Sequence, residues 1–259
     1  MAADEPFAGW DWDWEDPDGL APRMDEFSAS LARCDKLEQV AAAVPRTRAR
    51  LAELGVTGIE FAAFKTAHPS GLGTDLAGLS SEDAATGPGP VYRVDGQSLF
   101  TQLDITEPLP LDDGCVDWVY AEHLIEHVPL PAAIGWLAEV RRVLAPAGLV
   151  RITTPDLARY IEGYHEDSAF YAKHRRRLKV MRVGPPMPDR RAFMFNQIFY
   201  LYGHRWIYDL DELRHALVAA GFAAESVREC AFRQGSRADV AELDTTFRSD
   251  ETIYVEANA

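Results

Sequence analysis

The segment Glu122–His127, which reads Glu-His-Leu-Ile-Glu-His, carries the side chains with the clearest capacity for chemistry. An imidazole titrates close to neutral pH, so His123 is a candidate general base. The pattern His-x-x-Glu-His is also the inverted form of a zinc-hydrolase motif, in which two histidines bind the metal and the glutamate activates water. Here an apolar run precedes the motif, Pro129 follows two residues after it, and no third ligand is signalled. We therefore predict no metal site, and we interpret Glu126 and His127 as anchors of their loop.

The residues around this segment predict one unit of a parallel α/β sheet. The apolar run Cys115–Tyr120 is short and ends at charged residues, as a buried central strand does when it reaches a site. A helix should follow, because Pro131 stands near its first turn and apolar residues recur at helical spacing up to Leu144. Leu149–Thr154 then alternates as the next strand, and Pro155 ends it by removing a backbone donor.

Five short strings within residues 103–160 point to a known family. They are Asp104-Ile105-Thr106 with Pro108 and Pro110, the strand Val116–Tyr120, the segment Glu122–His127, the turn Arg142–Gly148, and Thr154-Pro155-Asp156. Together they resemble the class I S-adenosylmethionine-dependent methyltransferases. The resemblance implies an α/β, Rossmann-like class I methyltransferase fold, with a mostly parallel seven-stranded sheet, an antiparallel last strand and helical decoration at the N-terminus. It also implies S-adenosylmethionine as the cofactor.

The cofactor loop of that family departs from its pattern here. Gly58–Phe64 should be the first strand and loop, but Ala62, Ala63 and Phe64 stand where the family has glycines, and the next glycine is Gly71. A left-handed backbone at alanine costs roughly 1–2 kcal/mol, and the Phe64 ring would occupy volume that the cofactor needs. The resemblance places cofactor contacts at Phe61, Ala63 and Lys65. Either the cofactor lies differently or it is not bound.

Two aspartates compete for the role of the acid that accepts hydrogen bonds from the ribose hydroxyls. The resemblance favours Asp75, at the end of the strand-like run Leu72–Leu76, and one carboxylate has the two oxygens that this contact requires. Asp95 is the alternative, because Val91–Val94 is also strand-like. A solvated loop carboxylate is the plain reading of either residue.

The resemblance assigns further residues to the site. Asp104 and Ile105 are expected at the adenine, and Glu122 is expected to line the pocket. His123 and His204 are the catalytic candidates, as acid/base groups or substrate contacts. Substrate contacts are expected from a second set of residues before the last helix: Tyr202, Arg205 and Trp206.

An insertion over about 157–203 precedes that last helix, and such insertions vary with substrate in this family. Its residues 173–182 are basic, which fits an anionic substrate or an acidic partner, although pairing with this chain's own acidic segments explains them as well. The aromatic run 193–202 could line an apolar pocket or belong to ordinary core. Asp209 and Glu212 should cap the helix, and Gly221 should end it. Strands at Val227–Phe232 and Thr252–Glu256 close the sheet.

Composition limits the substrate classes and the cellular location that we expect. The chain of 259 residues has a formal net charge of −15, which argues against a nucleic-acid substrate. Three cysteines without metal-like spacing indicate buried reduced thiols, and with no membrane-spanning run or signal peptide we expect a cytoplasmic protein. We divide the chain into an acidic, tryptophan-rich arm at 1–22, N-terminal helices at 23–57 and an α/β domain at 58–259.

These observations predict methyl transfer from S-adenosylmethionine to a small molecule, anionic or aromatic, in specialised metabolism. The alternative is a protein that keeps the fold but catalyses a cyclisation, elimination or hydrolysis, or that acts as a non-catalytic partner subunit. No nucleic acid or membrane partner is expected, and a homodimer or a partner protein stays open.

Overall fold

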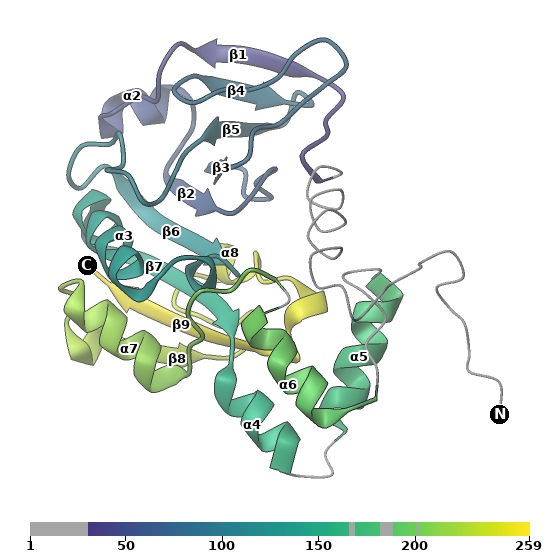
Figure 1. Cartoon of the computed structure of the whole chain (residues 1–259). Helices are drawn as coiled ribbons and strands as arrows, with labels where there is room; N and C mark the ends of the chain where they lie inside the picture. Colours follow the sequence, from purple (N-terminus) through teal and green to yellow (C-terminus); the bar gives the residue numbers. More distant parts are fainter. Residues whose placement is uncertain (1–30, 166–168, 182–188, 201) are drawn as a thin grey trace.

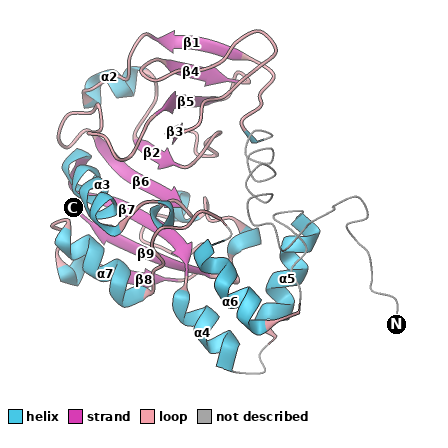
Figure 2. Ribbon diagram, viewed as in Figure 1, coloured by secondary structure: helices cyan, strands magenta, loops and turns pink. Residues whose placement is uncertain are grey.

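The computed structural model describes residues 31–165, 169–181, 189–200 and 202–259. Figures 1 and 2 show one long twisted sheet with helices packed along it. The arm predicted at residues 1–22 lies outside the described residues. Among the described helices, none is long and apolar enough to cross a membrane.

Among the described residues, nine strands form the sheet, in the order β1-β4-β5-β3-β2-β6-β7-β9-β8. Their bounds are β1 Leu37–Ala41, β2 Gly58–Phe61, β3 Gly71–Asp75, β4 Val91–Val94, β5 Ser98–Gln102, β6 Val116–Glu122, β7 Leu144–Pro155, β8 Arg228–Cys230 and β9 Thr252–Asn258. Strands β5, β3, β2, β6 and β7 are parallel to their neighbours in that order. The last strand, β9, is antiparallel to both β7 and β8. The predicted Rossmann-like class I methyltransferase fold is confirmed.

The seven strands from β5 to β8 in this order match the predicted sheet, and two further strands extend it past β5. Strand β4 pairs antiparallel with β5, and β1 pairs antiparallel with β4. Val91–Val94 (β4) therefore lies between the edge strand β1 and β5, whereas Gly71–Asp75 (β3) is a strand of the parallel core. Asp75 stands at the carboxyl end of a core strand, whereas Asp95 follows β4, which is antiparallel to both of its neighbours.

Of the range 23–57, in which helices were expected, residues 23–30 lie outside the described part of the chain and the rest contains both helix and strand. Residues Arg48–Glu53 form helix α2, capped by Thr47, but Leu37–Ala41 is strand β1. Its helix-like spacing was overridden by pairing, since β4 provides backbone partners and Leu37 packs near Val94 and Phe100.

The other helices are α3 Leu130–Val143, α4 Leu157–His165, α5 Phe170–Met181, α6 Arg191–Tyr200, α7 Leu210–Ala219 and α8 Ala238–Ala241, with 3-10 turns η2 Ile125–His127, η3 Ala224–Ser226 and η4 Thr246–Arg248. Helix α7 begins as predicted, because the Asp209 side chain accepts a hydrogen bond from the amide of Glu212. It ends before Gly221, whose φ of +99° suits glycine.

Alternation along the strands gives the sheet two different faces. One face joins β2, β6 and β7 to α3 and α7 in the main core, where Ile59, Val119 and Trp136 are buried. The opposite face carries Trp118 and Tyr120, which pack against Val240 of α8. The C-terminal segment around α8 packs on this second face through Val240 and Leu243.

The insertion forms the three helices α4, α5 and α6, which Figure 1 shows at one end of the sheet. They share a small core around Tyr160, Tyr171 and Met194. On the basic helix α5, Arg177 pairs with Asp250 at 3.4 Å. That pairing is the expected one with an acidic segment of the same chain.

Candidate active site

The carboxyl ends of the parallel strands gather most of the predicted site residues at one edge of the sheet. Strands β2, β3, β5 and β6 end at Phe61, Asp75, Gln102 and Glu122, so the residues that follow each strand meet there. Open α/β sheets bind their ligands at this edge. The geometry below therefore concerns one region built from distant parts of the sequence.

The loop after β2 takes a left-handed backbone at Ala62, with φ of +55°. The Ala63 amide then donates to the Thr74 carbonyl oxygen at 2.9 Å, which holds the loop against β3. A Cβ at Gly73 would lie 2.8 Å from the Ala63 carbonyl oxygen, so only glycine allows this approach. Residues 62–70 form no helix.

The side chains of this loop point into other environments. Phe61 is buried in the main core, edge-on to Trp136 with ring centroids 5.4 Å apart, so its backbone alone faces the site edge. Phe64 packs with the outer cluster that contains Leu79 and Phe100, rather than filling the cofactor volume as the sequence suggested. Lys65 forms an ion pair with Asp95, Nζ to Oδ2 at 2.7 Å.

Two carboxylates stand at the ends of neighbouring strands. Asp75 lies opposite Gln102 across the β3–β5 pair, and its carbonyl oxygen accepts a hydrogen bond from the Leu103 amide at 3.0 Å. Asp104 therefore lies just beyond the end of β5, the strand that pairs with β3. Burial raises the pKa of the Asp75 carboxyl, while backbone hydrogen bonds oppose the shift. Ile105, next to Asp104, packs against the main core.

Glu122 and His123, at the end of β6, are both engaged by the C-terminal segment. The Thr245 hydroxyl donates to Glu122 Oε1 at 2.6 Å. His123 is buried with φ of +49°, its Nε2 lies 2.8 Å from Thr252 Oγ1, and its Nδ1 lies 3.3 Å from Glu126 Oε1. Both ring nitrogens of His123, the predicted general base, thus contact protein atoms, and these contacts fix the orientation of the ring.

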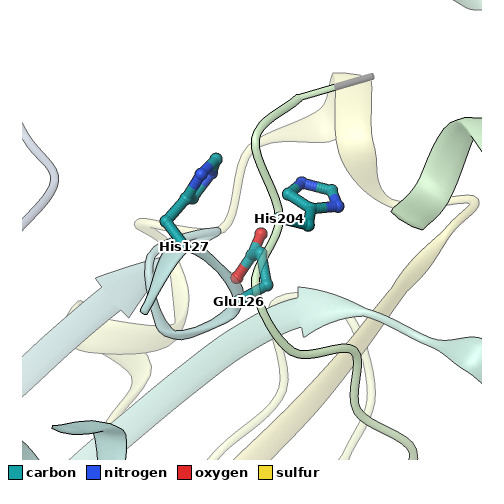
Figure 3. A group of neighbouring side chains, drawn as sticks. All are labelled: Glu126, His127 and His204. Carbon is teal, nitrogen blue, oxygen red and sulfur yellow. The ribbon is translucent and has the colours of Figure 1, made fainter. Parts of the chain in front are cut away.

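A second group forms where η2 meets the segment that follows α6. Ligand atoms of Glu126, His127 and His204 all lie within 4.8 Å of one another. Figure 3 shows the Glu126 carboxylate between the two imidazole rings. The His-x-x-Glu-His spacing suggested His123 and His127 as a pair, but the structure turns His123 away toward Thr252 and brings His204 in instead.

The electrostatics of this group follow from its burial. Glu126 is fully buried; burial by itself would raise the pKa of its carboxyl, but the neighbouring imidazoles, His123 first, lower it to about 2. Burial lowers the pKa of His204, although Glu126 opposes that shift. The group at neutral pH is therefore a carboxylate beside an uncharged His204 imidazole.

The backbone ties the two segments together. The Glu126 carbonyl oxygen accepts hydrogen bonds from the amides of Arg205 at 2.7 Å and Trp206 at 3.2 Å. The Trp206 indole donates to Glu212 at 2.7 Å, and the Tyr202 hydroxyl accepts from Gln197 at 3.0 Å. The Arg205 side chain is exposed.

Sequence reasoning missed the part played by the C-terminal segment. Thr245 and Thr252 contact the end of β6, yet this stretch reads only as a polar connection between the last two strands. Spacing along the chain carries no signal for such contacts. The available signal for the Glu126 group was the Glu-His pair itself, and its third member comes from a distant segment.

A family model described as "Methyltransferase domain" matches residues 32–227. No curated protein sequence matches the chain.

Solved structures similar to the chain include two S-adenosylmethionine-dependent methyltransferases. The one from Archaeoglobus fulgidus has 11% identity over 98% of this chain and 97% of that chain, with a TM-score of 0.43. The one from Mesorhizobium loti has 18% identity over 81% of this chain and 95% of that chain, with a TM-score of 0.42. With identities and scores this low, assignment to a family rests on the family model.

Proposed function

Because this chain belongs to the methyltransferase-domain family, we propose that it transfers a methyl group from S-adenosylmethionine to a small molecule. The observation that carries the cofactor part of the proposal is the position of Asp75 and Asp104, which stand at the ends of adjacent parallel strands at the ligand-binding edge. The net charge of −15 further supports an acceptor other than a nucleic acid.

The residues present fit the adenosine half of the cofactor. One carboxylate at the end of β3 can accept from two ribose hydroxyls, and Asp104 can accept from an adenine amino group. Both hydrogen bonds that Asp104 accepts from Thr106 fall on Oδ1, at 2.8 and 2.7 Å. The left-handed Ala62 and the bare Gly73 let the loop pack closely on β3, which places the loop at the carboxyl edge of the sheet.

The methionine half meets a different surface from the one the family pattern predicts. Since residues 62–70 form no helix, the loop offers backbone groups of Ala63 and Lys65 rather than a helix N-terminus. We assign Phe61, Ala63 and Lys65 to this contact through their backbones. When bound, the cofactor supplies an electrophilic methyl group on a sulfonium.

The chain's own residues position and activate the acceptor. Glu122 is held by Thr245, and His123 is held by Thr252, so the end of β6 forms a fixed wall. The group Glu126, His127 and His204 is where we place activation of the acceptor's hydroxyl or amine. We assign Arg205 to an anionic group of the acceptor, and Tyr202 and Trp206 to an aromatic one.

The acceptor class is tested by incubating the full chain with methyl-labelled S-adenosylmethionine and a cell extract split by ultrafiltration. We expect label in new small molecules of the filtrate. Label found solely in retained protein or nucleic acid would overturn the proposal. A cytoplasmic location, and a homodimer or partner protein, stay predictions.

A further inference from the structure

The cluster formed by Glu126, His127 and His204 has the donor set of a metal centre. Two imidazoles and one carboxylate present three ligand atoms within 4.8 Å of one another. Figure 3 shows the His127 ring on one side of the Glu126 carboxylate and the His204 ring on the other. Glu126 and His127 belong to η2, and His204 belongs to the segment that follows α6. Nitrogen and oxygen donors of this kind bind zinc and other first-row divalent ions.

The Glu126 carboxylate lacks a donor on one side. Its Oε2 accepts a hydrogen bond from the Thr154 hydroxyl at 3.0 Å, but its Oε1 has no hydrogen-bond partner among the described residues. The side chain is fully buried. A buried charged oxygen without a donor is costly, and a cation is the ordinary remedy.

The nearest protein nitrogen to Oε1 is Nδ1 of His123, which lies 3.3 Å away and makes no hydrogen bond to it. The other ring nitrogen, Nε2, lies 2.8 Å from Thr252 Oγ1, and the Thr252 hydroxyl donates to the Arg248 carbonyl oxygen at 2.6 Å. The described side chains therefore leave Oε1 without a donor.

His204 is already in the form that a metal ligand takes. Its Nδ1 contacts the carbonyl oxygen of Ile198, which can only accept, so Nδ1 carries the proton. The lone pair is therefore on Nε2. A ring nitrogen that donates to a backbone carbonyl, with the opposite nitrogen free, is the usual arrangement around a metal-bound histidine.

We propose that Glu126, His127 and His204 bind a divalent transition-metal ion, for which zinc is the best match. Three protein ligands leave coordination open, as catalytic metal sites do. The backbone bonds from Arg205 and Trp206 to the Glu126 carbonyl oxygen fix the two contributing segments to each other. The site does not depend on the histidine pair of the sequence motif.

The open positions suit an oxygen of the methyl acceptor, an extension that rests on the function proposed above. A hydroxyl held at the ion loses its proton to water more readily. Its oxygen then forms the new bond to the methyl carbon while the sulfur–methyl bond breaks, with the electron pair left on sulfur. The proposed ion and the methyl acceptor therefore share one place, at Glu126, His127 and His204, where we also place activation of the acceptor.

The test is titration of Zn²⁺ and Co²⁺ into the full chain, purified without metal-affinity resin and stripped with chelator. Calorimetry and the visible spectrum of bound Co²⁺ should both report one ion per chain. His127→Ala and His204→Ala should each weaken binding by more than about tenfold. His215→Ala is the matched control, because His215 is exposed on α7, and it should bind like the wild type.

Two results would overturn the site: the absence of Zn²⁺ and Co²⁺ binding, or binding unchanged in both His127→Ala and His204→Ala. His127 is exposed, so its variant should fold even where a change at buried Glu126 does not. S-adenosylmethionine affinity, measured on the same samples, separates the proposals. If the chain binds the cofactor but no metal, only the metal-site proposal is wrong. If it binds metal but no cofactor, the metal site stands and the proposed function is wrong.

Discussion

The Leu103 amide donates a hydrogen bond to the Asp75 carbonyl oxygen at 3.0 Å, just past the point where β3 and β5 cease to pair. This bond carries the alignment of two parallel strands into the loop, so that Asp104 follows Asp75 at the same edge. Asp75 ends β3 and Asp104 follows β5, and the antiparallel strand β4 lies between them in the sequence. Their proximity is a product of the strand order.

Asp75→Ala should weaken S-adenosylmethionine binding by about tenfold or more, because a hydrogen bond to a charged group contributes roughly 1.5–3 kcal/mol. Calorimetric titration measures the change. Asp83→Ala is the control, since Asp83 is an exposed loop aspartate before β4. Equal affinity in wild type and Asp75→Ala would remove Asp75 from the site.

Ala62→Gly should raise the free energy of unfolding by roughly 1 kcal/mol, because glycine adopts the left-handed backbone that costs alanine about that much. The φ of Ala62 is +55°. Urea unfolding provides the measurement. Ala52→Gly in helix α2 is the matched control and should lower stability by about 1 kcal/mol. A loss of stability in both variants would contradict the strain at Ala62.

Glu60 should make stability depend on pH. Burial raises the pKa of this carboxyl from 4.5 to about 7, against the hydrogen bond that Thr66 donates to it at 2.5 Å. Since the folded-state pKa is the higher one, this contribution is full below pH 4.5 and is lost as pH rises through about 7. The loss amounts to about 3 kcal/mol.

Glu60→Gln should flatten that part of the profile. Urea unfolding at pH 5 and pH 8 measures it, with Glu53→Gln as the control because Glu53 makes an exposed ion pair with Arg50. Identical pH profiles for the wild type and Glu60→Gln would show that Glu60 titrates normally.

Arg151→Lys should destabilise the fold by about 3–5 kcal/mol, because it breaks a buried ion network. Arg151 is fully buried and binds Asp244 at 2.5 Å and Glu256 at 3.0 Å, which joins β7 to the C-terminal segment. Urea unfolding again measures the effect. Arg46→Lys tests an exposed pair with Asp112 and should change stability by less than about 1 kcal/mol. Similar small effects at both positions would contradict the network.

The sequence predicted best where structure is set locally. Strand β6, helix α3 and strand β7 follow from periodicity, Pro131 and Pro155 within one stretch of chain. The cap of α7 by Asp209 follows from two residues three apart. The fold class came from the same local strings.

Prediction failed where distant pairing decides. Leu37–Ala41 became a strand because β4, far along the chain, provides its partner. The Phe64 ring lies in the outer cluster, because β1 and β4 extend the sheet and build that cluster. His204 reaches Glu126 only because backbone bonds dock its segment onto η2.

The most direct test of the central claim is calorimetric titration of the full chain with S-adenosylmethionine and with S-adenosylhomocysteine. Because two carboxylates lie at the ends of adjacent parallel strands and the loop after β2 is held at the same edge, we predict micromolar binding of both, lost in the Asp75→Ala, Asp104→Ala double variant. The absence of binding at millimolar ligand would contradict the account and would indicate that this fold serves another reaction.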